Sequence, residues 1–380
     1  NIPNCSILYG KPFFNCSNLI SIDAKKCIGV ETKAFEGCTN LSCVNIPACL
    51  SIPDNMFRGF RNLTSIKLDN LKNIGYGVFH DCEKLNAINI KNCEKIINSA
   101  FFNCSSLSSI YIPNCSNIYP HAFGNCINLQ SVFIGTTSNT RDLSLYIGSC
   151  AFSNCQKLSN INLKLARSIG AGAFSNCISL KNLDLYNCKI QNSAFAGCKN
   201  LSKVSLTNCT PIGSIKSMNG GIFYGCNNLT NLDLSGFTIR NYEFAKCEKL
   251  SKVILKNCGG SIGNSAFFNC YNLKEVYIYG SELLSLGGSD VFNCTQNTPI
   301  PTKVPISGLK IYVKAGLKEN YMNLPNWSQY KNKIIEMFEN NQISYTTDNE
   351  SIINTFKGKE ISNSDYSDVN KELDNDIEQN

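Results

Sequence analysis

The sequence contains few of the patterns by which enzymes and membrane-spanning proteins are recognised. No apolar run approaches the roughly eighteen residues that a helix needs to cross a bilayer, so we expect no transmembrane segment. Only two histidines, His80 and His121, occur in 380 residues. The sequence has no nucleophile elbow, phosphate-binding loop, zinc-protease motif or pair of carboxylates at a defined spacing. These absences argue against an enzyme and against a bound cofactor or metal.

Charge is also scarce and unevenly distributed in this chain, whose net charge is +7. Residues 345–380 carry nine acidic and three basic side chains, a net charge of −6 that leaves +13 for the preceding residues. The lysines of that basic part are scattered and not clustered, which argues against a nucleic-acid partner. The acidic segment is polar and poor in aromatic residues, so we predict a disordered tail over 345–380.

What the sequence does contain is a repeat of 22 residues. A phenylalanine marks each copy; three residues later comes a cysteine in all but one copy, and three residues after that a leucine. A segment x-x-[IVL]-x-[ILA] follows, as in "LSSIYI" (107–112) and "LKNLDL" (180–185). A degenerate copy, "VFNC", is expected to close the series with Val291 in the phenylalanine position, giving about thirteen repeats over residues 1–306. The marker residues are Phe13, Phe35, Phe57, Phe79, Phe101, Phe123, Phe152, Phe174, Phe195, Phe223, Phe244 and Phe267.

The repeat predicts a short strand followed by tight turns. The L-x-x-I-x-I segment alternates apolar and polar residues and is rich in β-branched side chains, as strands are. The A-F-x-N-C-x-x-L segment has apolar residues three apart, which suits a short helical or 3₁₀ turn. Four buried side chains contribute about 6–12 kcal/mol per copy, and the conformational entropy lost by 22 ordered residues offsets most of it. A single copy should therefore not fold, whereas stacked copies share a continuous core.

The repeat resembles that of the BspA-type leucine-rich repeat family, whose copies read approximately L-x-x-I-x-I-P-x-x-x-x-x-I-G-x-x-A-F-x-x-C. The match is carried by "IYIPNCSNIYPHAF" (110–123) and "LARSIGAGAFSNCISL" (165–180). The resemblance implies an α/β repeat solenoid, a right-handed leucine-rich-repeat superhelix. Its concave side would hold a parallel β-sheet, and its convex side short helical or 3₁₀ turns. Members of the family from anaerobic bacteria and protists are often surface proteins.

Twenty of the twenty-two cysteines fall into two columns of the repeat. One column follows the phenylalanines, and the other lies three residues after the strand, half a repeat away. No C-x₂-C pair occurs, so a zinc site is not indicated. Two interpretations stay open: ladders of free buried thiols, which we favour, or several disulfides between adjacent coils roughly 5 Å apart. Cys43 and Cys150 lie outside both columns. Cys43 should point out of the sheet, where it is either a reactive thiol or a surface residue that arose by neutral drift.

Both ends of the repeat array differ from its middle. The chain starts at Asn1, part-way through a repeat and without a visible cap or secretion signal, so we expect a truncated N-terminus. Residues 307–344 change character and are predicted to form a strand-helix cap, with two helical stretches separated by Pro325. This segment is similar to the terminal cap of bacterial members of the family. Trp327 is expected to cover the open end of the last coil.

The candidate ligand-binding surface is the outward column of side chains on the concave sheet. In this column Tyr111 neighbours Phe133, and Ile254 neighbours Tyr277. Adjacent exposed aromatic residues on a polar sheet are candidate anchors for a protein or a glycan, although aromatic residues also favour strands for structural reasons alone. Three lengthened repeats (135–150, 207–221 and 279–290) should add loops on one face. The candidate residues are Tyr111, Phe133, Asp184, Tyr186, Asp233, Ile254, Tyr277 and Tyr279.

Two functions fit these features. The first is a non-enzymatic module, secreted or on the cell surface, that adheres to or recognises host or neighbouring-cell macromolecules through the concave sheet. The repeat without catalytic motifs and the family resemblance favour it. The second is a cytoplasmic scaffold that binds other proteins, favoured by the many thiols that a reducing compartment would preserve. In either case the expected partners are proteins or glycans and not nucleic acids.

Overall fold

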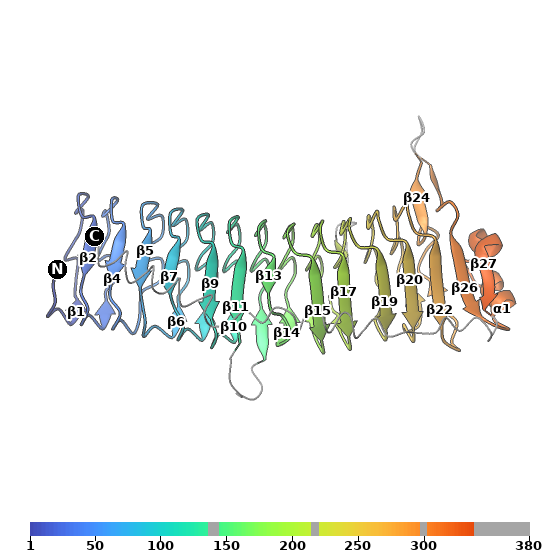
Figure 1. Ribbon diagram of the computed structural model, residues 1–380, viewed down its shortest axis with the longest axis horizontal. Helices are drawn as coiled ribbons and strands as arrows, with labels where there is room; N and C mark the ends of the chain where they lie inside the picture. Colours follow the sequence, from blue (N-terminus) through green and yellow to red (C-terminus); the bar gives the residue numbers. More distant parts are fainter. Residues whose placement is uncertain (136–143, 214–219, 297–301, 338–380) are drawn as a thin grey trace.

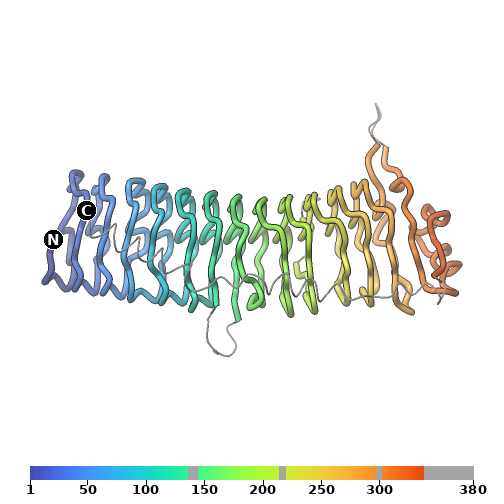
Figure 2. The backbone as a smooth tube through the Cα atoms, in the orientation of Figure 1, coloured from blue at the N-terminus to red at the C-terminus, as the bar shows by residue number. Residues whose placement is uncertain are grey.

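The computed structural model describes residues 1–135, 144–213, 220–296 and 302–337. These residues form one elongated stack of coils, gently bent along its length, with the N-terminus at one end and α1 at the other (Figures 1 and 2). The solenoid expected from the repeat is therefore confirmed. The tail predicted over 345–380 lies outside the described residues, as do residues 338–344 of the predicted cap.

The first row of strands comes from the L-x-x-I-x-I segments and is extended by two strands after the repeats (Figure 1). Equivalent strands of successive coils pair in parallel and in register, so that Phe133 lies opposite Tyr111. Alternate residues face the interior: Ile110 is buried, whereas Tyr111 lies on the outer side. The row runs as four sheets of four, three, two and five strands. Its strands are β2 (Ser21–Asp23), β4 (Cys43–Asn45), β5 (Ser65–Lys67), β7 (Ala87–Asn89), β9 (Ser109–Ile112), β11 (Ser131–Ile134), β13 (Asn160–Ile161), β15 (Asn182–Tyr186), β17 (Lys203–Thr207), β19 (Asn231–Ser235), β20 (Lys252–Lys256), β22 (Glu275–Tyr279), β26 (Lys310–Lys314) and β27 (Ile334–Met337).

A second row of shorter parallel strands, which the sequence analysis did not predict, comes from a later part of most coils. Ile118, for example, lies opposite Ile96 and Asn117 opposite Lys95. From β6 to β21 the isoleucines of this row are fully buried, so the row closes another side of the same core; Ile7 in β1 is exposed. Its strands are β1 (Ile7–Leu8), β3 (Gly29–Val30), β6 (Asn73–Ile74), β8 (Lys95–Ile96), β10 (Asn117–Ile118), β12 (Leu145–Ile147), β14 (Ala166–Ile169), β16 (Lys189–Ile190), β18 (Thr210–Pro211), β21 (Ser261–Ile262) and β23 (Ser285–Leu286).

The segments between the strands are consecutive tight turns and not the expected helical pieces. No α-helix occurs in the described residues before Lys318, so the repeats form a parallel β-solenoid and not an α/β structure. The residue before the column cysteine, or before Phe60 in the copy that lacks it, has a positive φ in all twelve copies. In most copies the residue four positions earlier also has a positive φ. In one coil these two residues are Asn125 (60°) and His121 (59°). Left-handed residues interrupt a helix, so hydrogen bonds such as Cys126 N–H to the Phe123 carbonyl oxygen (3.2 Å) close separate turns. The right-handed winding stays a prediction.

The phenylalanines stack as a continuous column through the core. From Phe13 to Phe292, successive ring centroids lie 5.1–5.7 Å apart with planes within 27° of parallel. The last position corrects a prediction, because Phe292 and not Val291 stacks on Phe267, at 5.5 Å. Val291 takes the place of the preceding alanine, since its carbonyl oxygen accepts a hydrogen bond from Phe267 N–H at 3.0 Å. Cys294 then stands one residue early and is only half-buried.

The cysteine columns line the same core, and all twenty-two cysteines are free thiols. In the column after the phenylalanines, each buried thiol donates a hydrogen bond to the carbonyl oxygen of the phenylalanine one coil earlier, at 3.0–3.3 Å. Most thiols of the second column bond to a carbonyl oxygen two residues away, as Cys49 does to Ser51 at 3.1 Å. This is the ladder arrangement that the sequence analysis favoured over disulfides between coils.

The C-terminal end of the stack is covered by residues that follow the repeats. Trp327 is fully buried; its indole N–H donates to the Leu284 carbonyl oxygen at 2.8 Å, and its ring lies 6.4 Å from that of Phe292. Of the two helical stretches predicted around Pro325, the second is only a 3₁₀ turn that leads into a strand paired with β26. A short antiparallel hairpin projects from the coil before it (Figure 1). The elements here are β24 (Asn293–Thr295), β25 (Lys303–Pro305), α1 (Lys318–Asn323) and η2 (Ser328–Lys333).

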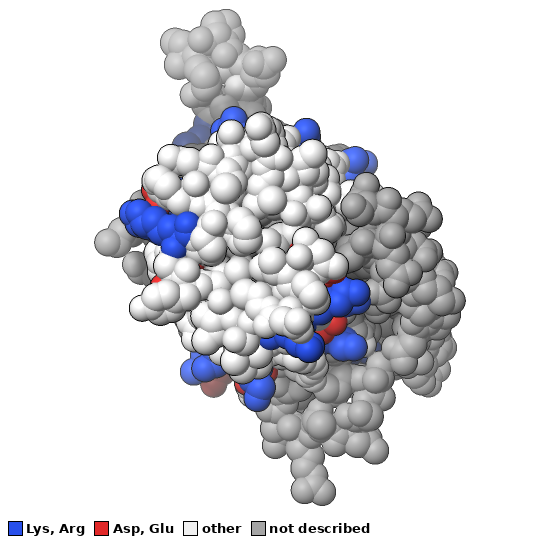
Figure 3. Space-filling view, turned by 90° about the vertical axis from the view of Figure 1, so that its left-hand side faces the viewer, with Lys and Arg blue, Asp and Glu red and all other residues white. Residues whose placement is uncertain are grey.

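The core positions of the first described coil are less covered than those of the second. Cys16 is exposed, and Phe13 and Leu19 are half-buried. Their equivalents Phe35 and Leu41 are 0% exposed. Figure 3 looks onto this end, which is largely uncharged and carries a few basic side chains at its rim. It is the least protected part of the described core.

Candidate functional site

The candidate surface is the outer side of the first strand row, which we call the strand face: the outward side chains of the strands from β2 to β27 in that row. Serine, asparagine, aspartate and lysine predominate on it. The predicted ligand-binding residues fall into three separate groups along this face and do not form one site. The groups are Tyr111 with Phe133 on β9 and β11, Asp184 with Tyr186 on β15, and Asp233, Ile254, Tyr277 and Tyr279 on β19, β20 and β22.

Tyr111 and Phe133 form a stacked pair on adjacent strands. Their ring centroids are 5.0 Å apart, with 24° between the planes, and both side chains are half-buried. Each ring covers one face of the other. Such a pair suits contact with apolar side chains better than stacking of a sugar ring, which needs an open aromatic face.

Tyr277 is not the exposed anchor that the sequence analysis predicted, because it is only 9% exposed. Tyr312 on β26 stacks on it at 4.6 Å and 10°, Tyr279 lies 6.2 Å away, and the Lys252 ammonium stands 4.8 Å from its ring centroid. The sequence analysis missed Tyr312 because it assigned that stretch to the cap. The segment 310–314, "KIYVK", has the same alternation as the repeat strands and could have been added to the column.

The acidic candidates lie beside polar or basic neighbours. Asp184 lies opposite Ser205 on β17, and Tyr186, two residues further along β15, is 50% exposed. The Asp233 carboxylate pairs with the Lys256 ammonium at 2.9 Å. Partly exposed ion pairs of this kind contribute about 0–1 kcal/mol, so a charged ligand can replace Lys256 or Asp233 as a partner at little cost.

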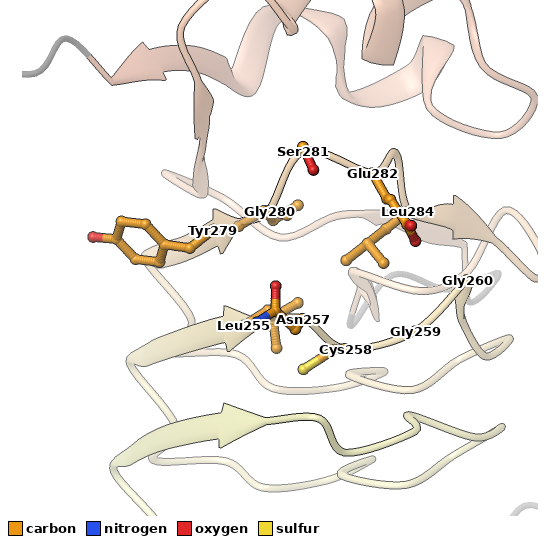
Figure 4. A pocket seen from close by; sticks show the side chains of 11 residues that line it. Leu255, Asn257, Cys258, Gly259, Gly260, Tyr279, Gly280, Ser281, Glu282 and Leu284 are labelled. Atoms are coloured by element: carbon orange, nitrogen blue, oxygen red, sulfur yellow. The ribbon is translucent and has the colours of Figure 1, made fainter.

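A cavity of about 270 Å³ opens between two coils beyond the ends of β20 and β22 (Figure 4). Its lining is of mixed polarity, with apolar side chains from Leu255, Ile278 and Leu284, polar ones from Asn257, Ser281 and Glu282, and the thiol of Cys258. That thiol already donates to a backbone carbonyl oxygen at 3.4 Å. The cavity lies at the base of the lengthened repeat 279–290. Loops of this kind often carry binding residues.

A buried ion pair lies away from the strand face. Glu243 is fully buried in the position that alanine usually occupies before the column phenylalanine, and its carboxylate accepts from Arg240 Nε at 2.9 Å and from Ile222 N–H at 3.0 Å. Burial raises the pKa of Glu243 above its ordinary value, and the Arg240 guanidinium opposes that rise. Arg240 also donates to two carbonyl oxygens of an earlier coil, at 2.7 and 2.8 Å. The pair therefore ties together coils on either side of the lengthened repeat 207–221.

The remaining polar groups of the described ranges do not provide the arrangement that a metal ion needs. No three histidine, cysteine or acidic side chains are grouped to hold a metal ion within the ranges that the structure describes. His80 and His121 lie in turns of different coils, and His80 Nδ1 is 2.9 Å from the carboxylate of Asp81. Among the described residues, no helix combines the length and the apolar character needed to span a bilayer.

Thiol exposure separates the structural cysteines from those open to reaction. Cys43 lies on the outer side of β4 as predicted, half-buried, and accepts a hydrogen bond from the Ser65 hydroxyl at 3.5 Å. Cys16, in the first described coil, is the most exposed thiol. Burial raises the pKa of Cys126 to about 12, so thiols of this kind stay protonated and unreactive near neutral pH. The special reactivity of Cys43 stays a prediction.

Comparison with known proteins connects this architecture to one family. A family model described as the BspA type leucine rich repeat region, in six copies, matches residues 28–144, 141–235 and 216–344. None of the curated proteins matches the sequence.

Among solved structures, the chain is similar to three bacterial proteins. A leucine-rich repeat protein from Bacteroides ovatus is 20% identical, with 78% of this chain and 92% of that chain covered and a TM-score of 0.40. A leucine rich cell surface protein from Faecalibacterium prausnitzii is 22% identical, with coverages of 70% and 80% and a TM-score of 0.41. The pneumococcal vaccine antigen PcpA is 20% identical, with coverages of 84% and 79% and a TM-score of 0.45. Since the family model matches more than half of the residues, the chain belongs to the BspA-type leucine-rich repeat family.

Proposed function

We propose that this protein is a non-enzymatic binding module that recognises macromolecules through its strand face. The observation that carries the proposal is the register of the first strand row. Equivalent residues of successive coils lie opposite one another. Side chains such as Tyr111 and Phe133 therefore form rows on the outer surface and do not belong to the core. A long, mostly polar surface with a few aromatic and charged groups suits a protein ligand, whose contacts are spread over many residues.

The more specific form of the proposal is adhesion to, or recognition of, host or neighbouring-cell macromolecules by a secreted or cell-surface protein. Membership of the BspA-type family supports it, since members from anaerobic bacteria and protists are often surface proteins. Glycans are the less favoured ligands, because the rings of the stacked pairs cover one another. Labelling of intact cells with an antibody to this protein, with lysed cells as the control, tests the location.

The binding role is tested by two double substitutions of aromatic pairs. Tyr111→Ala with Phe133→Ala removes a pair from the strand face. Tyr119→Ala with Tyr146→Ala removes an edge-to-face aromatic pair, 6.1 Å apart, that lies on β12 and directly after β10 in the second strand row. Binding of the labelled protein to cells and to immobilised matrix proteins should fall about tenfold for the first variant, as expected when aromatic anchors are removed. Equal binding by both variants would remove this aromatic pair from the proposed ligand-binding surface.

A second candidate is an intracellular scaffold that binds proteins through the same face. The observation in its favour is that all twenty-two cysteines are free, which a reducing compartment maintains. Alkylation of the protein in its native cells before lysis, followed by mass spectrometry, would find reduced thiols in either an intracellular or an anaerobic setting. The alkylation result and the surface labelling together separate the two candidates. Only an intracellular scaffold would have reduced thiols and also be inaccessible to antibody on intact cells.

A further inference from the structure

The C-terminal end of the strand face carries a continuous apolar row. Ile254, Tyr277, Tyr312 and Ile335 lie opposite one another on β20, β22, β26 and β27. At the usual strand spacing this row is about 14 Å long. Tyr277 is largely covered, so its neighbours supply the accessible surface; Ile335 is 37% exposed and Tyr312 half-buried.

Lysines stand on both sides of this row. On one side Lys252 and Lys310 flank Glu275 in a single register row across β20, β22 and β26. On the other side Lys256 and Lys314 lie at the far ends of β20 and β26. Lys256 already pairs with a carboxylate of β19, whereas Lys310 and Lys314 are exposed and form no ion pair with another described residue. The surface around the apolar row therefore has an excess of positive charge.

These two features together define the basic–apolar patch: Lys252, Ile254, Lys310, Tyr312, Lys314 and Ile335. The apolar row gains from burial against apolar side chains, and the flanking lysines attract carboxylates and disfavour basic ligands. Stacking of Tyr312 on Tyr277 covers one face of each ring and so reduces the aromatic surface open to a sugar or a nucleobase. A ligand that satisfies both features has acidic groups on either side of apolar ones.

We propose that the basic–apolar patch binds an acidic peptide segment that carries apolar side chains and belongs to a partner protein. The proposal rests on the proposed function and specifies the class of ligand for one part of the strand face. The segment lies along the row Ile254–Tyr312–Ile335, with its apolar side chains against the row and its carboxylates toward Lys310 and Lys314. The same chemistry predicts weak binding of neutral peptides and rejection of basic ones.

Fluorescence polarisation with two labelled synthetic peptides tests the proposal on the full chain. One peptide alternates glutamate with leucine, and the matched peptide has glutamine in place of every glutamate. The patch variant is Lys310→Glu with Lys314→Glu. The control is Lys95→Glu with Lys189→Glu, which makes the same charge change at exposed lysines of the second strand row. Circular dichroism of both variants checks that they fold.

The acidic peptide should bind the unchanged protein, with an affinity that falls as salt is added. Affinity should drop about tenfold or more in the patch variant and less than about twofold in the control. Tyr312→Ala should weaken binding severalfold without changing its salt dependence, because it removes apolar contact alone. Equal binding of the neutral peptide, or equal losses in patch variant and control, would overturn the proposal.

A chain that ends at residue 344 distinguishes a separate partner from the acidic residues 345–380 of the chain itself. If the probe binds only the shortened chain, the occupant is intramolecular and the partner proposed here is wrong. The proposed function is judged independently, by the Tyr111 and Phe133 variants. Loss of cell binding in those variants, with no binding of the acidic peptide, would leave the binding role intact and eliminate only the acidic ligand.

Discussion

The sulfur of Cys126 lies 3.1 Å from the carbonyl oxygen of Phe101, one coil earlier, and donates a hydrogen bond to it. The same oxygen also accepts from Cys104 N–H at 3.2 Å within its own coil. The thiol therefore has two roles, as a small apolar side chain in the core and as a donor that links neighbouring coils. Repetition of this bond explains why the repeat retains cysteine at a position where alanine or valine would also be buried.

Replacement of Cys126 by alanine should destabilise the protein by about 1–3 kcal/mol, because it removes a buried sulfur and an intercoil hydrogen bond. Cys16→Ala is the matched control, since Cys16 has the same place in the first described coil but is exposed and donates no such bond to another described residue. Its effect should stay below about 0.5 kcal/mol. Urea unfolding followed by circular dichroism measures both. Equal effects would show that the bond between coils contributes nothing.

Titration with a thiol reagent should separate the cysteines by exposure. In the folded protein Cys16 should react first, and the half-buried Cys5, Cys43, Cys150 and Cys294 more slowly. The remaining seventeen should react only after unfolding, since buried protonated thiols are poor nucleophiles. Mass spectrometry after alkylation assigns the sites, and Cys16→Ala should lack the fast phase. Fewer than twenty-two reactive thiols in denaturant without reductant would contradict the free-thiol ladders.

Alkaline pH should destabilise the fold through the same columns. Burial raises the pKa of Cys126, Cys198 and Cys247 from 9.0 to about 12. Above about pH 9 the unfolded chain releases these protons while the folded chain keeps them, so stability falls as pH rises, by about 1.4 kcal/mol per thiol and pH unit. The urea midpoint should therefore drop between about pH 8 and about pH 10.5, less steeply in Cys126→Ala. An unchanged midpoint over this range would contradict the prediction.

The repeat period was readable from the sequence because a solenoid places each residue directly beside its equivalent. The spacing of Phe101 and Phe123 thus predicted their stacking, and the strand pattern predicted the pairing of Tyr111 with Phe133. The turns were misjudged because apolar residues three apart fit a 3₁₀ turn and consecutive β-turns equally well. The asparagine or glycine before the cysteine was the available signal, since both residues tolerate a left-handed backbone.

Other features depended on contacts that a local pattern does not contain. Strands such as β8 and β10 have two residues each, too few to show alternation, and only the recurring Ile96 and Ile118 indicated them. The segment after Lys333 became a strand because β26 offers it a free edge. Likewise, Tyr312 covers Tyr277 because β26 pairs with β22 in the sheet. The repeat alone does not contain this contact, so it could not show that Tyr277 is covered and not exposed.

The left-handed turn position gives a direct test of the turn interpretation. Asn125 has a φ of 60°, and its side-chain oxygen accepts from Asn154 Nδ2 at 3.0 Å. Asn125→Ala and Asn125→Gly both lose that bond, but only alanine also meets the steric cost of this backbone, about 1–2 kcal/mol. The alanine variant should therefore be the less stable by about that amount in urea unfolding. Equal stabilities would mean that the turn readjusts to a right-handed backbone.

The single tryptophan reports on the covered C-terminal end, where the Tyr330 hydroxyl forms several hydrogen bonds. The Tyr330 hydroxyl accepts from Phe292 N–H at 3.2 Å and lies 2.8 Å from Asn293 Oδ1, and the ring is fully buried. Tyr330→Phe leaves that N–H without its partner, so it should cost about 1–3 kcal/mol. The loss should appear as earlier unfolding by Trp327 fluorescence, because the rings of Trp327 and Tyr330 are in contact at 6.4 Å. Tyr186→Phe, which alters a 50% exposed tyrosine on the strand face, is the control and should leave the transition unchanged. A Tyr330→Phe transition that coincides with that of the unchanged protein would show that the end of the stack is held by the apolar contacts of Trp327 alone.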